Sequence, residues 1–275
     1  MLELVIFSRN RPLQLYALLE SIDKYFDSDS ISVAVLHRYD QIYCEALEEV
    51  ADKFDHHEFI DEVVPSLAPG AGFKKHVQEL LARSGRLIAF LTDDIIFKES
   101  VDVNQVSEIM HANPNVLAFS LRLGLHISEC YALNQQQPVP AGSVWPPNIF
   151  AWAWKQACMD WQYPFSVDGH VFRKPQLSDW AAGLDYHHPN SFEEQLQACR
   201  KFSGIPEVML SHVVSRLVNL PINRVQETHQ NRCGSTTSEF LLAQWNKGLR
   251  LDIAHYHRLM NRGVHEELEL IFKER

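Results

Sequence analysis

The chain has 275 residues, of which 46% are hydrophobic and 22% charged, so its composition is that of an ordinary globular protein with ample sequence for a buried core. A formal net charge of −10 argues against general nucleic-acid binding, because phosphate backbones bind basic surfaces. No apolar run approaches the ~20 residues that span a bilayer, and the first residues lack the pattern of a secretory signal. We therefore expect a cytoplasmic protein with no membrane span, and peripheral membrane association stays open.

Strand and helix patterns alternate over the first 120 residues. Apolar runs predict buried strands at residues 2–7, 31–36, 59–64, 87–91 and 116–121. Apolar side chains at helical spacing predict helices at residues 12–26, 40–54, 73–84 and 103–112. This alternation predicts an α/β fold: a mostly parallel, Rossmann-like sheet with helices on both faces.

The pattern changes after Gly124, where a long, polar, Pro-rich loop extends to residue 147. Asp168-Gly169 lies between two strand-like segments, residues 163–167 and 170–173, and predicts a two-residue β-hairpin. The remaining elements are expected to be helices at 178–186 and 191–202, a strand pair within 208–220, and helix from residue 238. The second half of the chain is therefore predicted to be a smaller α+β region.

The five cysteines are odd in number, lie far apart and form no Cys-x-x-Cys pair. This pattern argues against a zinc knuckle or a disulfide scaffold and indicates a reducing compartment.

The most informative stretch is residues 87–97, where an apolar run leads to Asp93 and Asp94 and then turns apolar again. The carboxyl end of a parallel strand lies at the edge where open α/β sheets bind ligands. Two carboxylates there are costly to desolvate unless a charge compensates them, and a divalent cation is the obvious candidate. The alternative is an ordinary turn or helix cap, where aspartate is common.

Residues 5–12, Val-Ile-Phe-Ser-Arg-Asn-Arg-Pro, resemble the opening of nucleotide-sugar glycosyltransferases of the GT-A fold. The spacing from there to Thr92-Asp93-Asp94 also resembles the position of the acidic DxD motif of that fold. The resemblance implies a donor-binding half (1–123), an acceptor-side half of the same domain (124–237) and a C-terminal helical segment (238–275). The implied reaction transfers a sugar from a nucleoside diphosphate sugar, a UDP-sugar above all, to a hydroxyl of a glycan or small acceptor.

The resemblance also implies a divalent cation, Mn²⁺ or Mg²⁺, that neutralises the leaving diphosphate. Asp94 would bind this cation, and Asp93 would contact the ribose or reach the cation directly or through water. Thr92 occupies the first position of the motif, which departs from its commonest form. A late histidine, His229, would add a metal ligand, with His212 as a weaker candidate.

The donor itself would contact residues near the ends of the first strands. The resemblance implies that Ser8, Arg9 and Arg11 cradle the nucleotide, since an arginine fork pairs well with phosphate oxygens. The alternative is a simple strand-to-helix turn with solvated arginines. At the end of the second strand, His37 is a candidate contact to the base.

Two lysines, Lys74 and Lys75, follow the Gly70-Ala71-Gly72 loop, where the family often has a basic residue near the donor. One of them would pair with phosphate; a solvated helix face is the alternative.

Glu193 and Glu194 are the candidate catalytic residues, because inverting members of the fold often carry an acidic pair that opens a helix near the acceptor. One of the two would take the proton from the acceptor hydroxyl. Capping boxes that start at Ser191 or Asn190 explain the same glutamates without catalysis, so both readings stay open. Asp168 is better explained by its turn.

Fourteen histidines give few other metal candidates. Adjacent pairs such as His56-His57 do not share a helix face, so they predict only weak metal sites.

Two other functions remain as alternatives. A nucleotidyltransferase on a related frame would carry a glycine-rich basic signature after the first strand, and residues 8–12 contain no glycine. A non-catalytic nucleotide- or carbohydrate-binding module would bind the donor without transfer.

Overall fold

A computed structural model describes residues 1–68, 70–223 and 232–275. Its main sheet has nine strands, which in chain order are β1 (Leu2–Arg9), β2 (Ile31–Arg38), β3 (Glu58–Asp61), β4 (Leu87–Thr92), β6 (Val116–Ser120), β9 (Gly142–Trp145), β10 (Ile149–Ala153), β11 (His170–Arg173) and β12 (Val208–His212). Their spatial order is β3-β2-β1-β4-β11-β6-β12-β10-β9. Strands from both sides of residue 123 thus share one sheet, and the proposed boundaries at 123 and 237 stay predictions.

The first four neighbours in the sheet, β3, β2, β1 and β4, are all parallel. β11 then lies between β4 and β6 and is antiparallel to both, whereas β6 and β12 are parallel. The outer strands β10 and β9 are antiparallel to their neighbours. The predicted α/β class with a mostly parallel central sheet is confirmed.

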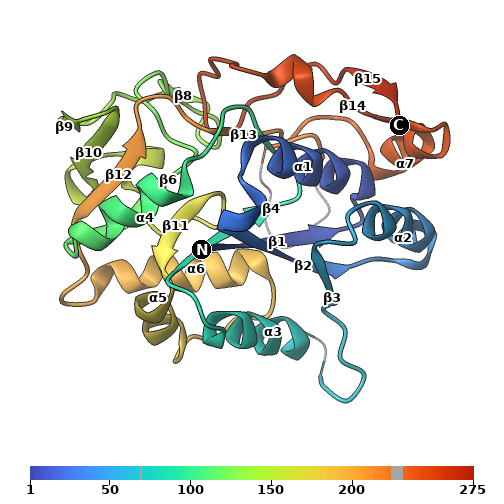
Figure 1. The fold of residues 1–275 in the computed structure, drawn as a ribbon, viewed down its shortest axis with the longest axis horizontal. Helices are drawn as coiled ribbons and strands as arrows, with labels where there is room; N and C mark the ends of the chain where they lie inside the picture. The colour runs from blue at the N-terminus through green and yellow to red at the C-terminus, as the bar shows by residue number, and fades with distance from the viewer. Residues whose placement is uncertain (69, 224–231) are drawn as a thin grey trace.

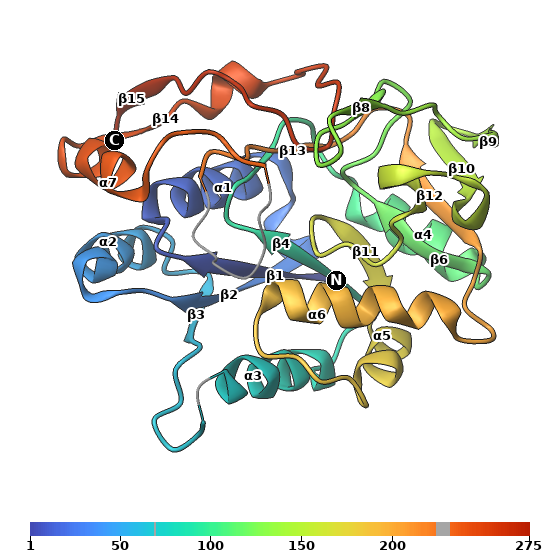
Figure 2. The ribbon, with the colours of Figure 1, turned by 180° about the vertical axis from the view of Figure 1, so that it is seen from behind.

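Helices cover both faces of this sheet (Figures 1 and 2). Helices that contribute to one core cluster are α1 (Pro12–Tyr25), α2 (Cys44–Lys53), α4 (Val103–Ala112) and α7 (Ser238–Asn246). Those of the other are α3 (Ala71–Ala82), α5 (Lys174–Ala181) and α6 (Pro189–Ala198). Along β1, Leu4 and Ile6 belong to the first cluster and Val5 and Phe7 to the second, because successive side chains of a strand point to opposite faces.

Smaller elements complete the fold. Three two-stranded sheets pair β5 (Ile95–Phe97) with β13 (Leu217–Asn219), β7 (Glu129–Cys130) with β8 (Gln135–Gln136), and β14 (Leu249–Leu251) with β15 (Phe272–Glu274). Short 3₁₀ turns are η1 (Ser28–Ser30), η2 (Gln41–Tyr43), η3 (Trp154–Gln156), η4 (Met159–Gln162), η5 (Cys199–Lys201) and η6 (Ile253–Tyr256). None of the helices in the described part of the chain is long and apolar enough to cross a membrane.

Two predicted pairings were wrong. The segment before Gly169 forms no strand of a hairpin; β11 instead pairs with β4 and β6, where Val171 and Phe172 are almost completely buried. The two strands expected within 208–220 exist, but β12 joins the main sheet and β13 pairs with β5. β11 and β12 each lie between two strands of the main sheet, whereas a local hairpin would provide one partner.

The predicted C-terminal helix is also shorter than expected. The α-helix ends with α7, and the chain then forms β14, the 3₁₀ turn η6 and β15. This segment covers the outer side of α1, where the Tyr16 ring contacts the rings of Phe54 and Trp245. α1 is consequently buried around most of its circumference.

Candidate active site

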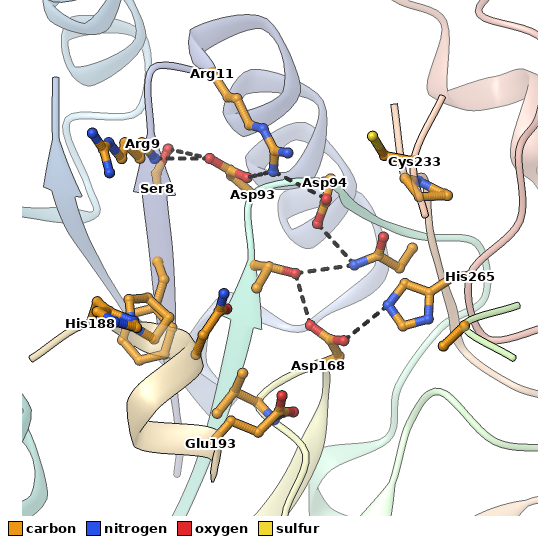
Figure 3. Close-up of a pocket in the computed structure, with 18 of the residues that line it drawn as sticks. Ser8, Arg9, Arg11, Asp93, Asp94, Asp168, His188, Glu193, Cys233 and His265 are labelled. Atoms are coloured by element: carbon orange, nitrogen blue, oxygen red, sulfur yellow. Dashed lines mark hydrogen bonds and ion pairs between the residues drawn. The ribbon is translucent and has the colours of Figure 1, made fainter. Parts of the chain in front are cut away.

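A cleft of about 940 Å³ opens at the carboxyl ends of β1 and β4. Figure 3 shows how side chains from distant parts of the chain converge on it. Ser8 and Arg9 come from the end of β1, and Asp94 from the turn after β4. Asp168 precedes β11, and Glu193 comes from the first turns of α6. This is the edge at which the sequence places the nucleotide site, because parallel strands present their carboxyl ends together.

Asp93 is the anchor of the turn between β1 and α1. One carboxylate oxygen accepts hydrogen bonds from Ser8 Oγ (2.9 Å) and from the backbone N–H of Arg9 (3.0 Å). The other accepts from Arg11 Nη1 at 2.8 Å. Burial raises the pKa of Asp93, and the Asp94 charge adds to this, while Arg11 opposes it. Since both oxygens of Asp93 hold the turn, we assign it a positioning role.

Arg11 is buried behind this turn and joins three chain segments. Its Nη1 also donates to Asp94 (3.1 Å), its Nε donates to Asn223 Oδ1 (2.8 Å), and its Nη2 donates to the Asn223 carbonyl. Burial disfavours the charged guanidinium, but the two aspartates outweigh burial and raise its pKa. The guanidinium therefore neutralises the aspartate pair, and the exposed arginine of the turn is Arg9, which lines the cleft.

Asp94 lines the cleft, and both of its carboxylate oxygens accept hydrogen bonds. Besides Arg11, it accepts a hydrogen bond from Asn219 Nδ2 at 2.8 Å. The Oδ1 of Asn219 is buried and has no hydrogen-bond partner within the described residues. Carboxylate oxygens are ligands that Mg²⁺ and Mn²⁺ prefer, so Asp94 fits a hard cation, and the amide nitrogen of Asn219 orients its carboxylate.

The described residues supply only part of such a site. In residues 1–68, 70–223 and 232–275, no three His, Cys, Asp or Glu side chains around the cleft bring their ligand atoms within 4.8 Å of one another. His229 lies outside the described residues. His212 is buried against Phe119 with a ring-centroid distance of 4.9 Å and does not line the cleft. A cation bound by few carboxylates completes its shell with donor phosphates and water.

Asp168 is a further carboxylate that lines the cleft, although the sequence pattern explained this residue by its turn. It accepts hydrogen bonds from Thr92 Oγ1 (2.9 Å) and Arg122 Nη1 (3.3 Å), and its Oδ2 lies 3.2 Å from His265 Nε2. Burial raises its pKa, but His265, Arg122 and Thr92 together hold that pKa well below its usual range. Conversely, Asp168 raises the pKa of His265 against the effect of burial.

A sequence signal for these residues does exist. Arg122 follows an apolar strand, as Asp93 does, and Asp168 follows the apolar pair Phe165 and Val167 just before the antiparallel β11. A polar residue directly after an apolar run is what marks this edge of the sheet.

Glu193 lines the cleft, whereas Glu194 is exposed outside it. Glu193 Oε1 accepts a hydrogen bond from the backbone N–H of Val167 at 3.0 Å. Burial raises the pKa of Glu193, and the neighbouring Asp168 charge adds to this. Burial and the Glu193 charge likewise raise the pKa of Tyr163.

The capping explanation for these glutamates was wrong. The N-cap of α6 is His188, whose Nδ1 accepts from the Ser191 N–H at 3.2 Å, while Ser191 Oγ accepts from the His188 N–H at 3.1 Å. The capping box therefore starts two residues earlier than expected from Asn190, and neither glutamate takes part in it.

Three predicted donor contacts lie away from the cleft. His37 is flanked by the rings of Tyr39 and Phe59, at centroid distances of 5.9 and 6.3 Å. Lys74 Nζ donates to the Leu184 carbonyl at 2.7 Å. Lys75 pairs with Glu79 on the surface of α3 at 3.3 Å, as the solvated-face alternative describes.

Comparison with known proteins supports the resemblance read from the sequence. No protein-family model matches the chain. A bifunctional glycosyltransferase, pgtA of Dictyostelium discoideum, is 23% identical over 261 residues, which cover 84% of this chain and 33% of that protein. This chain thus spans about a third of the length of that relative.

Among solved structures, S. aureus TarS (residues 1–349) in complex with UDP-GlcNAc has a TM-score of 0.46 and 11% identity, covering 76% of this chain and 55% of that one. The mannosyltransferase PcManGT from Pyrobaculum calidifontis, in complex with GDP-Man and Mn²⁺, has a TM-score of 0.43 and 13% identity, covering 78% and 56%. The sequence relative carries the conclusion: this chain resembles a glycosyltransferase over most of its length, as its sequence predicted.

Proposed function

We propose that this chain is a metal-dependent glycosyltransferase that moves a sugar from a nucleoside diphosphate sugar, with UDP as the nucleotide, to an acceptor hydroxyl. The carrying observation is the cleft at the carboxyl edge of the sheet, where Asp94 and Glu193 both line one cavity. The glycosyltransferase relative supports this assignment.

On the donor side, Arg9 is the exposed arginine of the β1–α1 turn, lines the cleft and would pair with the diphosphate. Asp94 would hold Mn²⁺ or Mg²⁺, with Asn219 orienting its carboxylate. When bound, this cation supplies charge neutralisation to the departing diphosphate. Asp93 and Arg11 would keep the turn in place, so that Asp94 meets the donor in a fixed position.

On the acceptor side, Glu193 would take the proton of the attacking hydroxyl onto its carboxylate. A raised pKa makes a carboxylate a better base near neutral pH. Asp168 stays ionised because its pKa is lowered, so the two carboxylates of this wall have environments that push their pKa values apart. We therefore propose Glu193 as the base and Asp168 as an acceptor-orienting residue.

The division of labour follows the two halves of the chain. Residues 1–123 would bind the donor, and 124–237 would select a glycan or small hydroxyl acceptor. Cys130, Tyr131 and Leu133, from the polar loop after Gly124, line the cleft and are the acceptor-side contacts this division implies.

A thermal-shift experiment tests the donor site. UDP with Mn²⁺ should stabilise the wild type by about 2.7 kcal/mol at free ligand 100 times Kd, because it binds only the native state. Asp94→Asn should lose the Mn²⁺-dependent part of the shift, and Asp179→Asn, an exposed control on α5, should keep it. An unchanged response of Asp94→Asn would remove Asp94 from the metal site.

Transfer from a panel of radiolabelled nucleoside diphosphate sugars then tests the activity itself. Donor binding without Mn²⁺-dependent transfer or hydrolysis across the panel would identify a binding module instead. Pyrophosphate release from a nucleoside triphosphate would identify a nucleotidyltransferase.

A further inference from the structure

A second group of metal-ligating side chains lies away from the cleft. Asp23 belongs to the last turn of α1, and His56 and His57 form the turn between α2 and β3. α1 starts at the carboxyl end of β1 and runs back along the sheet, while β3 begins directly after His57. The group is therefore at the amino-end edge of the sheet, opposite the cleft.

The three side chains converge on one point. His57 Nε2 lies 3.0 Å and His56 Nε2 lies 3.2 Å from the same oxygen, Asp23 Oδ1. In a tetrahedral zinc site with bonds of 2.0–2.1 Å, neighbouring ligand atoms are separated by roughly 3.3 Å. The two distances are thus close to the edges of such a site. Among the residues that the structure describes, this is the group of three His, Cys, Asp or Glu side chains whose ligand atoms all lie within 4.8 Å of one another.

The histidine pair is unusual because it is not helical. The two residues follow α2, so the rule that adjacent helical residues face apart does not apply to them. The sequence-based argument that His56 and His57 make only a weak metal site assumed a helix and was wrong on that point. Their ring centroids are 4.0 Å apart. Two imidazolium ions at that distance repel each other, whereas two neutral imidazoles and a carboxylate are a normal donor set for a divalent transition metal.

The surroundings favour the same reading. Asp55 lies 3.9 Å from the other ring nitrogen of His56, beyond hydrogen-bond distance, and adds a carboxylate beside the group. The His57 side chain is only 6% exposed, but those of His56 and Asp23 are 51% and 37% exposed, which leaves one side of the group open to an entering ion.

We propose that Asp23, His56 and His57 bind one Zn²⁺ ion, with water at the fourth position. Imidazole ligands favour Zn²⁺ over Mg²⁺ and Mn²⁺, which prefer oxygen. The ion would cross-link the end of α1 to the turn before β3. Because the unfolded chain lacks this arrangement, binding would stabilise the native state by mass action.

Calorimetry on the full, tag-free, metal-depleted protein tests the site. Titration with ZnCl₂ should show one more equivalent for the wild type than for the double variant His56→Ala/His57→Ala. Asp23→Asn, which keeps its size and an acceptor oxygen, should raise Kd by at least about tenfold, since loss of even an outer contact costs that much. The matched control His111→Ala/His255→Ala removes two exposed histidines elsewhere and should bind as the wild type does.

Two readouts without activity complete the design. Zn²⁺ should raise Tm of the wild type and not of the double variant, and Mg²⁺ should raise neither through this site. If the double variant fails to fold, NMR of the wild type tests the proposal by itself. The ring-nitrogen signals of His56 and His57 must then shift when Zn²⁺ is added. Equal stoichiometry in all variants, or unmoved signals, overturns the proposal and leaves a simple histidine–aspartate ion pair.

Discussion

The turn between β1 and α1 carries two arginines in opposite environments. Arg11 is buried and bonded to Asp93, Asp94 and Asn223, whereas Arg9 is exposed and contributes its backbone N–H to Asp93. The family pattern assigns both to the nucleotide, but the Arg11 guanidinium already compensates the buried Asp93 and the cleft-facing Asp94, so we propose a structural role for it. Removing the Arg11 guanidinium would leave the buried Asp93 carboxylate without a compensating charge.

We predict that Arg11→Ala lowers the free energy of unfolding by about 3–5 kcal/mol, the usual cost of breaking a buried ion pair on one side. Arg9→Ala should change stability by less than about 0.5 kcal/mol, as exposed substitutions do, and should weaken donor binding instead. Urea unfolding and nucleotide titration of the two variants measure both effects. A stability loss shared equally by both variants would contradict the assignment.

Glu193 and Glu194 form a second contrasting pair, since only the first lines the cleft. Glu193→Gln should lower kcat by about 10²–10⁴-fold, the range for a lost general base, with donor binding retained. Glu194→Gln should leave kcat unchanged. Because a base works above its pKa, the raised pKa of Glu193 shifts the loss of activity on acidification to a pH higher than that of an ordinary glutamate. A Glu193→Gln variant with the wild-type kcat and pH profile would exclude it as the base.

At the scale of elements, the insertion of β11 between β4 and β6 determines where Asp168 lies. Gly169 allows the sharp entry into this strand with φ of +87°. A Cβ atom at this position would lie 2.5 Å from Leu217 Cδ2, so a side chain there would also force Leu217 to shift. The hydrogen bond from the Gly169 N–H to the Phe90 carbonyl (2.8 Å) fixes the entry against β4.

Gly169→Ala should therefore destabilise the protein by roughly 1–3 kcal/mol from backbone strain, with the clash adding to that cost. Gly204→Ala is the matched control, because Gly204 has φ of +81° but a Cβ atom there would meet no other atom within 4 Å. Gly204→Ala should therefore show the stability cost of backbone strain without that of a clash. Thermal unfolding of both variants measures the difference, and equal losses would show that Leu217 moves aside at no cost.

The same elements explain which sequence predictions were correct. α4 begins and ends at the predicted residues, and β4 leads into the aspartate pair as expected, because both patterns are local. The predicted hairpin at Asp168-Gly169 does not form, because an Asp-Gly pair indicates a turn but does not determine which strand the following residues pair with. The contact of Lys74 with the Leu184 carbonyl was not foreseen, because the two residues are 110 positions apart in sequence.

At the scale of the whole molecule, buried histidines couple stability to pH. Burial lowers the pKa of His170 to about 3, with Arg122 adding to this, and lowers that of His212 to about 3, with Arg216 adding. Both are almost completely inaccessible. In the unfolded chain they take up protons near pH 6.5, while the native state excludes these protons down to much lower pH.

The stability that neutral histidines provide is thus complete above about pH 6.5 and is lost as pH falls toward 3. Between pH 7 and pH 5, protonation of each histidine in the unfolded chain should lower the free energy of unfolding by about 2 kcal/mol. Urea unfolding across this range measures the loss, and His212→Gln should reduce the proton uptake on unfolding at pH 5 by about one. An unaltered slope in that variant would show that His212 is protonated in the native state.

The amino-acid sequence by itself determined the α/β class, the edge of the sheet that carries the cleft, and the aspartate pair after β4. These depend on periodicity and on the order of strands and helices, which are properties of contiguous residues. Only the tertiary structure decided which groups meet there: Arg11 beside both aspartates, Asn219 beside Asp94, His265 and Arg122 on Asp168, and the histidine pair on Asp23. Such contacts join residues tens to hundreds of positions apart, and their partners follow from the packing of the sheet and helices, which no local pattern encodes.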